Sequence, residues 1–126
     1  VGTVLYETGG WVSHPRFSPA GDLIAFIDHP IQNDDRGSVV LVGVNTKARL
    51  VSADWLSAQG LAWDAAGREV WFTATKQGNA RAVYAVTLDG ERQRLVYRSA
   101  GTLTLQDIAP DGRILLTRNS VRIGII

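Results

Sequence analysis

The 126-residue sequence contains no cysteine and no methionine. Without cysteine the chain has no disulfides, no thiolate chemistry and no zinc site of the cysteine type. Neither sign of charge is in excess, because 13 Lys and Arg stand against 12 Asp and Glu and the formal net charge is +1. This balance argues against a protein that binds nucleic acid or a membrane surface through bulk positive charge.

Long apolar runs and a basic-then-apolar opening segment are also missing from the sequence. No run approaches the ~20 residues of a membrane-spanning helix, so we expect no membrane insertion. The absence of methionine, even at residue 1, leads us to expect a processed, excised or engineered segment of a larger protein. The sequence does not indicate the cellular compartment of that protein. A hydrophobic content of 45% is enough for one packed domain.

What the sequence does contain is a threefold repeat. Each copy has an apolar residue, a short turn that ends in glycine, and a dense apolar run. The glycines are Gly21, Gly67 and Gly112, which lie 46 and 45 residues apart. Glycine suits the end of a tight hairpin because it adopts positive φ without a Cβ clash. We align the copies without gaps over residues 17–26, 63–72 and 108–117.

Further apolar stretches extend each copy to about four short strands, and no stretch shows a sustained helical period. Repeated four-stranded units of ~40–50 residues are typical of β-propeller blades. The run from Leu23 to Ile27 does not alternate, so it must be covered on both faces, as the strands of stacked blades are. We therefore predict an all-β propeller. A β-sandwich is the alternative, although it does not explain the repeat.

The first ten residues resemble the end of a blade and not its beginning. Residues 4–10 align with residues 95–101, which form the outer strand of the middle unit and its exit loop. The third unit stops after its third strand. The predicted organisation is therefore a blade over 11–54, a blade over 55–100, and a split blade that combines 101–126 with 1–10.

Three blades are too few for a ring, because natural propellers have about 4–8. We therefore expect a homodimer that closes a six-bladed ring with two-fold symmetry, and a nine-bladed trimer is the alternative. The first strand of one chain should complete the third blade of its partner. The predicted interface residues are Thr3, Val4, Leu5, Tyr6, Val121, Ile123 and Ile125.

Catalytic signatures such as Gly-x-Ser-x-Gly and His-Glu-x-x-His are not found. The two histidines, His14 and His29, are expected in different loops. Asp28, His29, Asp34 and Asp35 form the only acidic group with an imidazole, and it lacks the spacing of a calcium loop. A solvated loop explains that group better than a metal or general-base site. We expect no enzyme activity, no metal and no cofactor.

Polar residues precede the first apolar residue of each repeat. The first strand of a blade begins near the central axis, so these side chains would ring one mouth of the channel. They could hold water, an ion, a peptide end or a small ligand, or they could pair only with backbone and channel water. The candidate binding residues are Ser13, His14, Gln59, Gln106 and Asp107.

The repeat resembles the WD40-like family with a Trp-Ser-Pro-Asp-Gly blade motif, the TolB-type propellers. The residues that carry the resemblance are Phe17-Ser18-Pro19-Ala20-Gly21 with Leu23-Ile24-Ala25-Phe26, and Ala109-Pro110-Asp111-Gly112. Residues 11–15, 58–63 and 103–108 look like the propeller attached to bacterial serine/threonine protein kinases. The resemblance implies six blades and a non-catalytic binding or sensor scaffold. The alternatives are the gating propeller of a prolyl-oligopeptidase-like hydrolase and a TolB-like envelope component.

Overall fold

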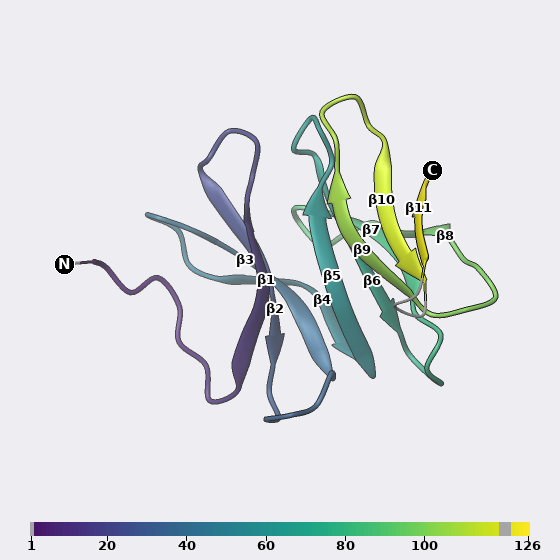
Figure 1. Ribbon diagram of the computed structural model, residues 1–126. Coiled ribbons are helices and arrows are strands. Elements are labelled where there is room, and N and C mark those ends of the chain that lie inside the picture. Colours follow the sequence, from purple (N-terminus) through teal and green to yellow (C-terminus); the bar gives the residue numbers. More distant parts are fainter. Residues whose placement is uncertain (1, 119–121) are drawn as a thin grey trace.

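All regular elements of the described chain are β-strands, as predicted. The computed structural model describes residues 2–118 and 122–126, with the backbone alone for Arg122 and Ile123. The strands form two four-stranded antiparallel sheets and one three-stranded sheet, which follow one another side by side (Figure 1). Among the residues described, no helix is long and apolar enough to cross a membrane.

Each sheet is built from consecutive strands, which is the arrangement of propeller blades. The first sheet contains β1 (Trp11–Phe17), β2 (Leu23–His29), β3 (Gly37–Gly43) and β4 (Arg49–Trp55). The second contains β5 (Ser57–Trp63), β6 (Glu69–Thr75), β7 (Ala82–Thr87) and β8 (Gln93–Tyr97). The third contains β9 (Leu103–Ile108), β10 (Ile114–Arg118) and β11 (Arg122–Ile125). The first strands β1, β5 and β9 contact one another in sequence and so mark the axis.

The hairpin turn of the third blade is one residue shorter than the other two. The closing backbone hydrogen bond runs from Asp64 N–H to Glu69 O in the second blade, and from Ala109 N–H to Arg113 O in the third. The gapless alignment is therefore wrong after Gly112. The true equivalents include Phe26, Phe72 and Leu116 on one face of the blades, and Ala25, Trp71 and Leu115 on the other.

The apolar core lies between neighbouring sheets. Trp55 at the end of β4 is 1% exposed and packs on the second sheet, with ring centroids 5.5 Å from Phe72 and 4.8 Å from Tyr84. A second cluster between the second and third sheets includes Val83 and Leu105. Because the second sheet is covered on both faces, its strands β6 and β7 are apolar on both faces, as the sequence indicated.

Candidate functional site

The first strand of each blade is irregular where it passes the axis. His14 in β1 and Gly60 in β5 both have positive φ, 56° and 88°, and lie at β-bulges. A Cβ atom on Gly60 would lie 2.4 Å from the carbonyl oxygen of Leu105 in β9. Thr73 Oγ1 accepts the Leu105 N–H at 3.0 Å across the same contact. Glycine thus allows β5 and β9 to approach each other closely.

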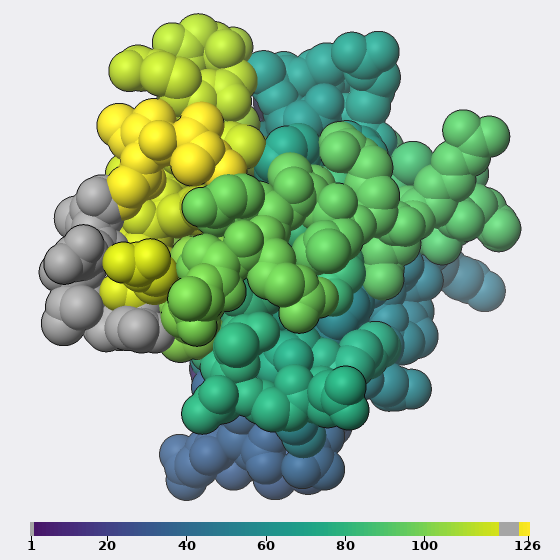
Figure 2. Space-filling view, turned by 90° about the vertical axis from the view of Figure 1, so that its right-hand side faces the viewer, coloured from purple at the N-terminus to yellow at the C-terminus, as the bar shows by residue number. Residues whose placement is uncertain are grey.

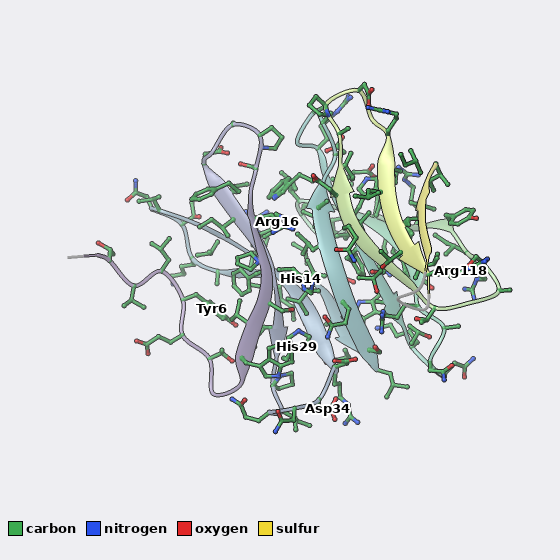
Figure 3. The ribbon with its side chains drawn as sticks, viewed as in Figure 1. Tyr6, His14, Arg16, His29, Asp34 and Arg118 are labelled. Atoms are coloured by element: carbon green, nitrogen blue, oxygen red, sulfur yellow. The ribbon has the colours of Figure 1, made fainter. Side chains whose placement is uncertain are left out.

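Ser13 joins the two histidines, which the sequence had suggested lie in separate loops. Figure 3 labels both histidines, which lie on the neighbouring strands β1 and β2. Its Oγ lies 2.9 Å from His14 Nδ1 and 2.7 Å from His29 Nε2, and His29 Nδ1 lies 3.0 Å from Arg36 O. Because a carbonyl only accepts, His29 Nδ1 carries a proton, and in the neutral imidazole Nε2 accepts from the Ser13 hydroxyl. Ser13 Oγ then accepts from His14 Nδ1–H. His29 is fully buried and stacks on Trp11, with ring centroids 3.9 Å apart.

The expectation of separate loops is wrong because β1 and β2 are paired strands. Trp11 pairs with His29 and Ser13 with Ile27, so the two histidines lie near each other across the hairpin. The half-buried His14 lies in a positive environment. Burial lowers the pKa of His14, and Arg16, His29 and Arg81 lower it further. These effects favour the neutral imidazole.

Arg81, which precedes β7, reaches from the second blade to the third. Its guanidinium donates to Ser57 Oγ at 3.2 Å and to Thr104 Oγ1 at 2.8 Å. Burial lowers the pKa of Arg81, while the charge of Asp35 opposes that shift. Asp35 itself accepts a hydrogen bond from Gln59 Nε2 at 2.7 Å. Sequence reasoning missed Arg81 and this role of Asp35, because both come from connecting loops that carry no repeat signal.

Gln106 and Asp107 lie farther along the inner strands. Gln106 Nε2 donates to Thr117 Oγ1 at 3.1 Å, within the third blade. Asp107 lines a hollow of about 300 Å³ together with Arg16 and Trp63, beside the hairpin turns. The five candidate residues therefore occupy different settings along the axis. Ligand binding there stays a prediction.

The acidic residues of the first blade hold the backbone and the N-terminal segment. Asp28 accepts hydrogen bonds from the Tyr6 hydroxyl and from Thr8 Oγ1, the latter at 2.9 Å. Asp34 accepts the Arg36 N–H at 2.7 Å. Over residues 2–118 and 122–126, no group of three or more His, Asp or Glu side chains is placed to hold a metal ion.

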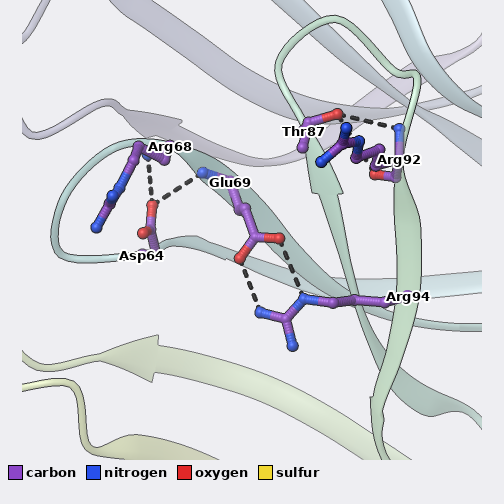
Figure 4. A network of polar contacts seen from close by, with 6 residues as sticks. All are labelled: Asp64, Arg68, Glu69, Thr87, Arg92 and Arg94. Carbon is purple, nitrogen blue, oxygen red and sulfur yellow. Dashed lines mark hydrogen bonds and ion pairs between the residues drawn. The ribbon is translucent and has the colours of Figure 1, made fainter.

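A second polar network lies on the second blade (Figure 4). Glu69 on β6 and Arg94 on β8 form a two-pronged ion pair at 2.8 and 3.2 Å, and the hydrogen bond from Arg94 lowers the pKa of Glu69. Asp64 accepts the N–H groups of Arg68 and Glu69 at 2.6 and 2.9 Å. All of these contacts lie within one blade, so the network joins strands and a hairpin turn of the same sheet.

The N-terminal residues 2–10 cross the free face of the first sheet. Leu5 and Tyr6 pack against a buried cluster that contains Phe26 and Val40, and the Tyr6 and Phe26 rings are 4.8 Å apart. Burial, together with the hydrogen bond and charge of Asp28, raises the pKa of Tyr6 to about 12. The segment is thus attached to the sheet face through side chains, without strand pairing.

Leu5 packs in the same way as one residue in each of the outer strands β4 and β8. The pairing of β3 with β4 skips Val51, and that of β7 with β8 skips Val96. Both skipped residues pack in the core beside the next sheet. Leu5, which aligns with Val51 and Val96, likewise packs against the sheet that follows it.

The third sheet shows the complementary feature, because β11 is paired only with β10 in the described part of the chain. An apolar hollow of about 200 Å³ lies beside it, where Gly124 carries no side chain. In Figure 2 the C-terminal residues (yellow) lie uncovered beside the green segment that includes β8. The predicted interface residue Val121 lies outside the described residues, and Ile123 is described by its backbone alone. The hollow is lined mainly by Tyr97, Leu103, Leu116, Gly124, Ile125 and Ile126.

Comparison with known proteins supports the propeller fold. The family described as the dipeptidyl peptidase IV (DPP IV) N-terminal region matches residues 31–120. The crystal structure of TolB from Acinetobacter baumannii matches with a TM-score of 0.70 and 18% identity, over 90% of this chain and 28% of that one. The predicted TolB-type propeller is thereby confirmed, whereas the resemblance to kinase-attached propellers stays a prediction. Among curated proteins, none matches significantly.

Proposed function

The chain belongs to the family of the dipeptidyl peptidase IV N-terminal region, a β-propeller region, and from this premise we propose that it is a non-catalytic binding scaffold. A second copy of the same chain completes its ring. The observation that carries this proposal is the pair of complementary ends. Leu5 and Tyr6 pack on the free face of the first sheet without strand pairing, and among the described residues β11 has no neighbour other than β10.

The register of the proposed strand exchange follows from the second blade. There Tyr84 on β7 pairs with Leu95 on β8. Gly124 takes the position of Tyr84, and Val4 aligns with Leu95, so Val4 of one copy lies opposite Gly124 of the other. Val4 is 71% exposed in the single chain, and its side chain would enter the hollow beside Gly124.

A chain cannot make this contact with its own strand, because its two ends lie on opposite sides of the molecule (Figure 1). Two copies bury the free faces of the first and third sheets, at about 25 cal/mol per Å² of apolar surface. Each ladder hydrogen bond of the exchanged strand adds about 0.5–1.5 kcal/mol. Both contributions favour an assembly of two chains over a folded monomer.

Disulfide trapping tests the register with no background, because the sequence contains no cysteine. The double variant Val4→Cys with Gly124→Cys should oxidise to a covalent two-chain species, and a Cβ on Gly124 meets nothing within 4 Å. The matched control is Val4→Cys with Ile125→Cys, because Ile125 points to the other face of the sheet. Equal trapping of both variants would reject the register.

The mass of the unmodified chain tests the assembly itself. Light scattering should give twice the chain mass of 13.7 kDa, and removal of residues 2–8 should abolish that species. Three times the chain mass would favour the nine-bladed trimer. A folded species of one chain mass would overturn the proposal.

Ligand binding is proposed at the axial mouth, where two copies would bring two sets of Ser13, His14 and Gln59 around one channel. These side chains are polar groups of the inner strands and lie near Arg81, whereas the clusters between neighbouring blades are apolar. Titration with a set of short peptides, followed by NMR, should shift the signals of these residues. Shifts confined to the outer strands β4 and β8 would refute this site.

The family match favours a second candidate, in which the chain is part of the propeller of a prolyl-peptidase-type hydrolase. Such a propeller would control access to a separate catalytic domain. The sequence of the parent gene would distinguish this candidate from the scaffold, because the hydrolase requires a Gly-x-Ser-x-Gly segment downstream of the propeller. A TolB-like envelope role rests on the fold alone and requires a signal peptide and an α/β domain upstream.

A further inference from the structure

Phe17 is a large apolar side chain that the single chain leaves 69% exposed at the end of β1. The equivalent residue of the second blade, Trp63, is only 6% exposed. Trp63 Nε1 donates to the carbonyl of Arg16 in the preceding blade at 3.0 Å. Trp63 also belongs to the same buried cluster as Ala25 and Leu41 of that blade. This repeat position therefore makes the contact from one blade to the blade before it.

The third blade has a matching hollow on its free face. Strand pairing makes Leu115 equivalent to Ala25 and Ile125 equivalent to Leu41, because Ala25 pairs with Leu41 and Leu115 with Ile125. The hollow measures about 180 Å³. Apolar cavities of about 150 Å³ accept benzene, so a phenyl ring fits this space. Its lining residues are Asp107, Ala109, Arg113, Ile114, Leu115 and Ile125.

We propose that Phe17 of one copy inserts into this hollow of the other and fixes how the two half-rings meet. The inference rests on the ring closure proposed above and names its anchor. Within one chain, Trp63 packs in the same cluster as Ala25 and Leu41. In the ring, Phe17 would pack in the equivalent way against Leu115 and Ile125 of the other copy. A two-fold ring contains this contact twice, so each substitution acts at two places.

Two substitutions at one position test the anchor in opposite directions. Phe17→Ala should weaken the dimer about tenfold at each contact, and therefore raise its Kd about 100-fold. Phe17→Trp restores the side chain of the second blade, whose indole N–H can donate to the Asp107 carbonyl, and should lower the Kd. The control is Leu56→Ala. Leu56 is 41% exposed, but it links β4 to β5 within one chain.

Sedimentation equilibrium over a dilution series measures these changes. A dimer whose Kd is the same for the unmodified chain, Phe17→Ala and Phe17→Trp would overturn the anchor and leave the ring closure standing. A monomeric unmodified chain would instead overturn the closure. In a double-mutant cycle, Phe17→Ala and Ile125→Ala together should weaken the dimer less than the product of their separate effects. A full product would reject the contact.

Discussion

Replacement of Gly60 by alanine tests whether the close approach of β5 and β9 holds the second and third blades together. An added Cβ would lie 2.4 Å from Leu105 O and 2.7 Å from Leu105 N, where real Cβ atoms are essentially never found. Leu105 cannot move aside freely, because its N–H donates to Thr73 Oγ1 at 3.0 Å. We expect Gly60→Ala to separate the blades locally and to lower the free energy of unfolding.

The magnitude has two parts. A non-glycine residue with left-handed φ costs about 1–2 kcal/mol, and Gly60 has φ +88°. Loss of the Leu105–Thr73 hydrogen bond leaves a buried N–H unpaired and costs about 1–3 kcal/mol more. The sum is about 2–5 kcal/mol, a large part of the ~5–15 kcal/mol that stabilises a typical domain.

Gly112→Ala is a matched control because Gly112 has φ +90°, and an added Cβ there meets nothing within 4 Å. It should therefore cost only the backbone part, about 1–2 kcal/mol. Urea unfolding followed by the fluorescence of the four tryptophans measures both variants, at one chain concentration because the proposed assembly would contribute to stability. Equal losses for the two variants would show that β5 and β9 are not in the tight contact described.

Other predictions concern the axial histidines. Because the pKa of His14 is lowered in the folded chain, the unfolded chain takes up a proton first, and stability should fall as the pH drops from about 7 through 6.5. His14→Asn, which tolerates positive φ, should flatten this dependence in urea midpoints, and an unchanged slope would reject the assignment. Ser13→Ala leaves the buried His29 Nε2 without its donor and should lower the free energy of unfolding by about 1–3 kcal/mol in the same assay. A decrease of less than about 0.5 kcal/mol would contradict the hydrogen bond between Ser13 and His29. The chain should not hydrolyse ester, peptide or phosphate substrates. Turnover that disappears on substitution of Asp28, His29 or Asp35 would overturn this.

The blade architecture could be predicted because the repeat carries local signals that the structure uses directly. Gly21, Gly67 and Gly112 all have positive φ, and the N–H of each donates to a carbonyl three residues earlier within its hairpin turn. Runs such as Leu23 to Ile27 are covered on both faces by neighbouring sheets or by the N-terminal segment. Local turn chemistry and double-sided burial therefore determine the fold class.

The shorter third turn could not be predicted, and the reason is physical. The run Ile114-Leu115-Leu116 is apolar at every position, so a shift by one residue exchanges one apolar side chain for another. In a strand with one polar face, the same shift would place polar residues in the core and would be apparent. Burial on both faces, which identifies the propeller, also conceals the register of its strands.

The contact of Ser13 with His14 and His29 was missed for a different reason. It depends on the pairing of β1 with β2 and on the bulge at His14, neither of which leaves a residue pattern. The same holds for Arg81, whose partners Ser57 and Thr104 are more than twenty residues away along the chain. Polar contacts around the axis are made between blades and loops, whereas the repeat describes only what each blade shares with the others.

Ring closure and axial binding are physically linked in the proposed assembly. The inner strands of both copies would surround one channel, so a ligand that contacts His14 or Gln59 of each copy binds the dimer and not the separate chains. Such a ligand stabilises the dimer by RT ln(1 + [L]/Kd), about 2.7 kcal/mol at 100 times its Kd. Dilution that separates the copies must weaken ligand binding in turn. Binding that does not change with chain concentration would place the ligand within a single copy.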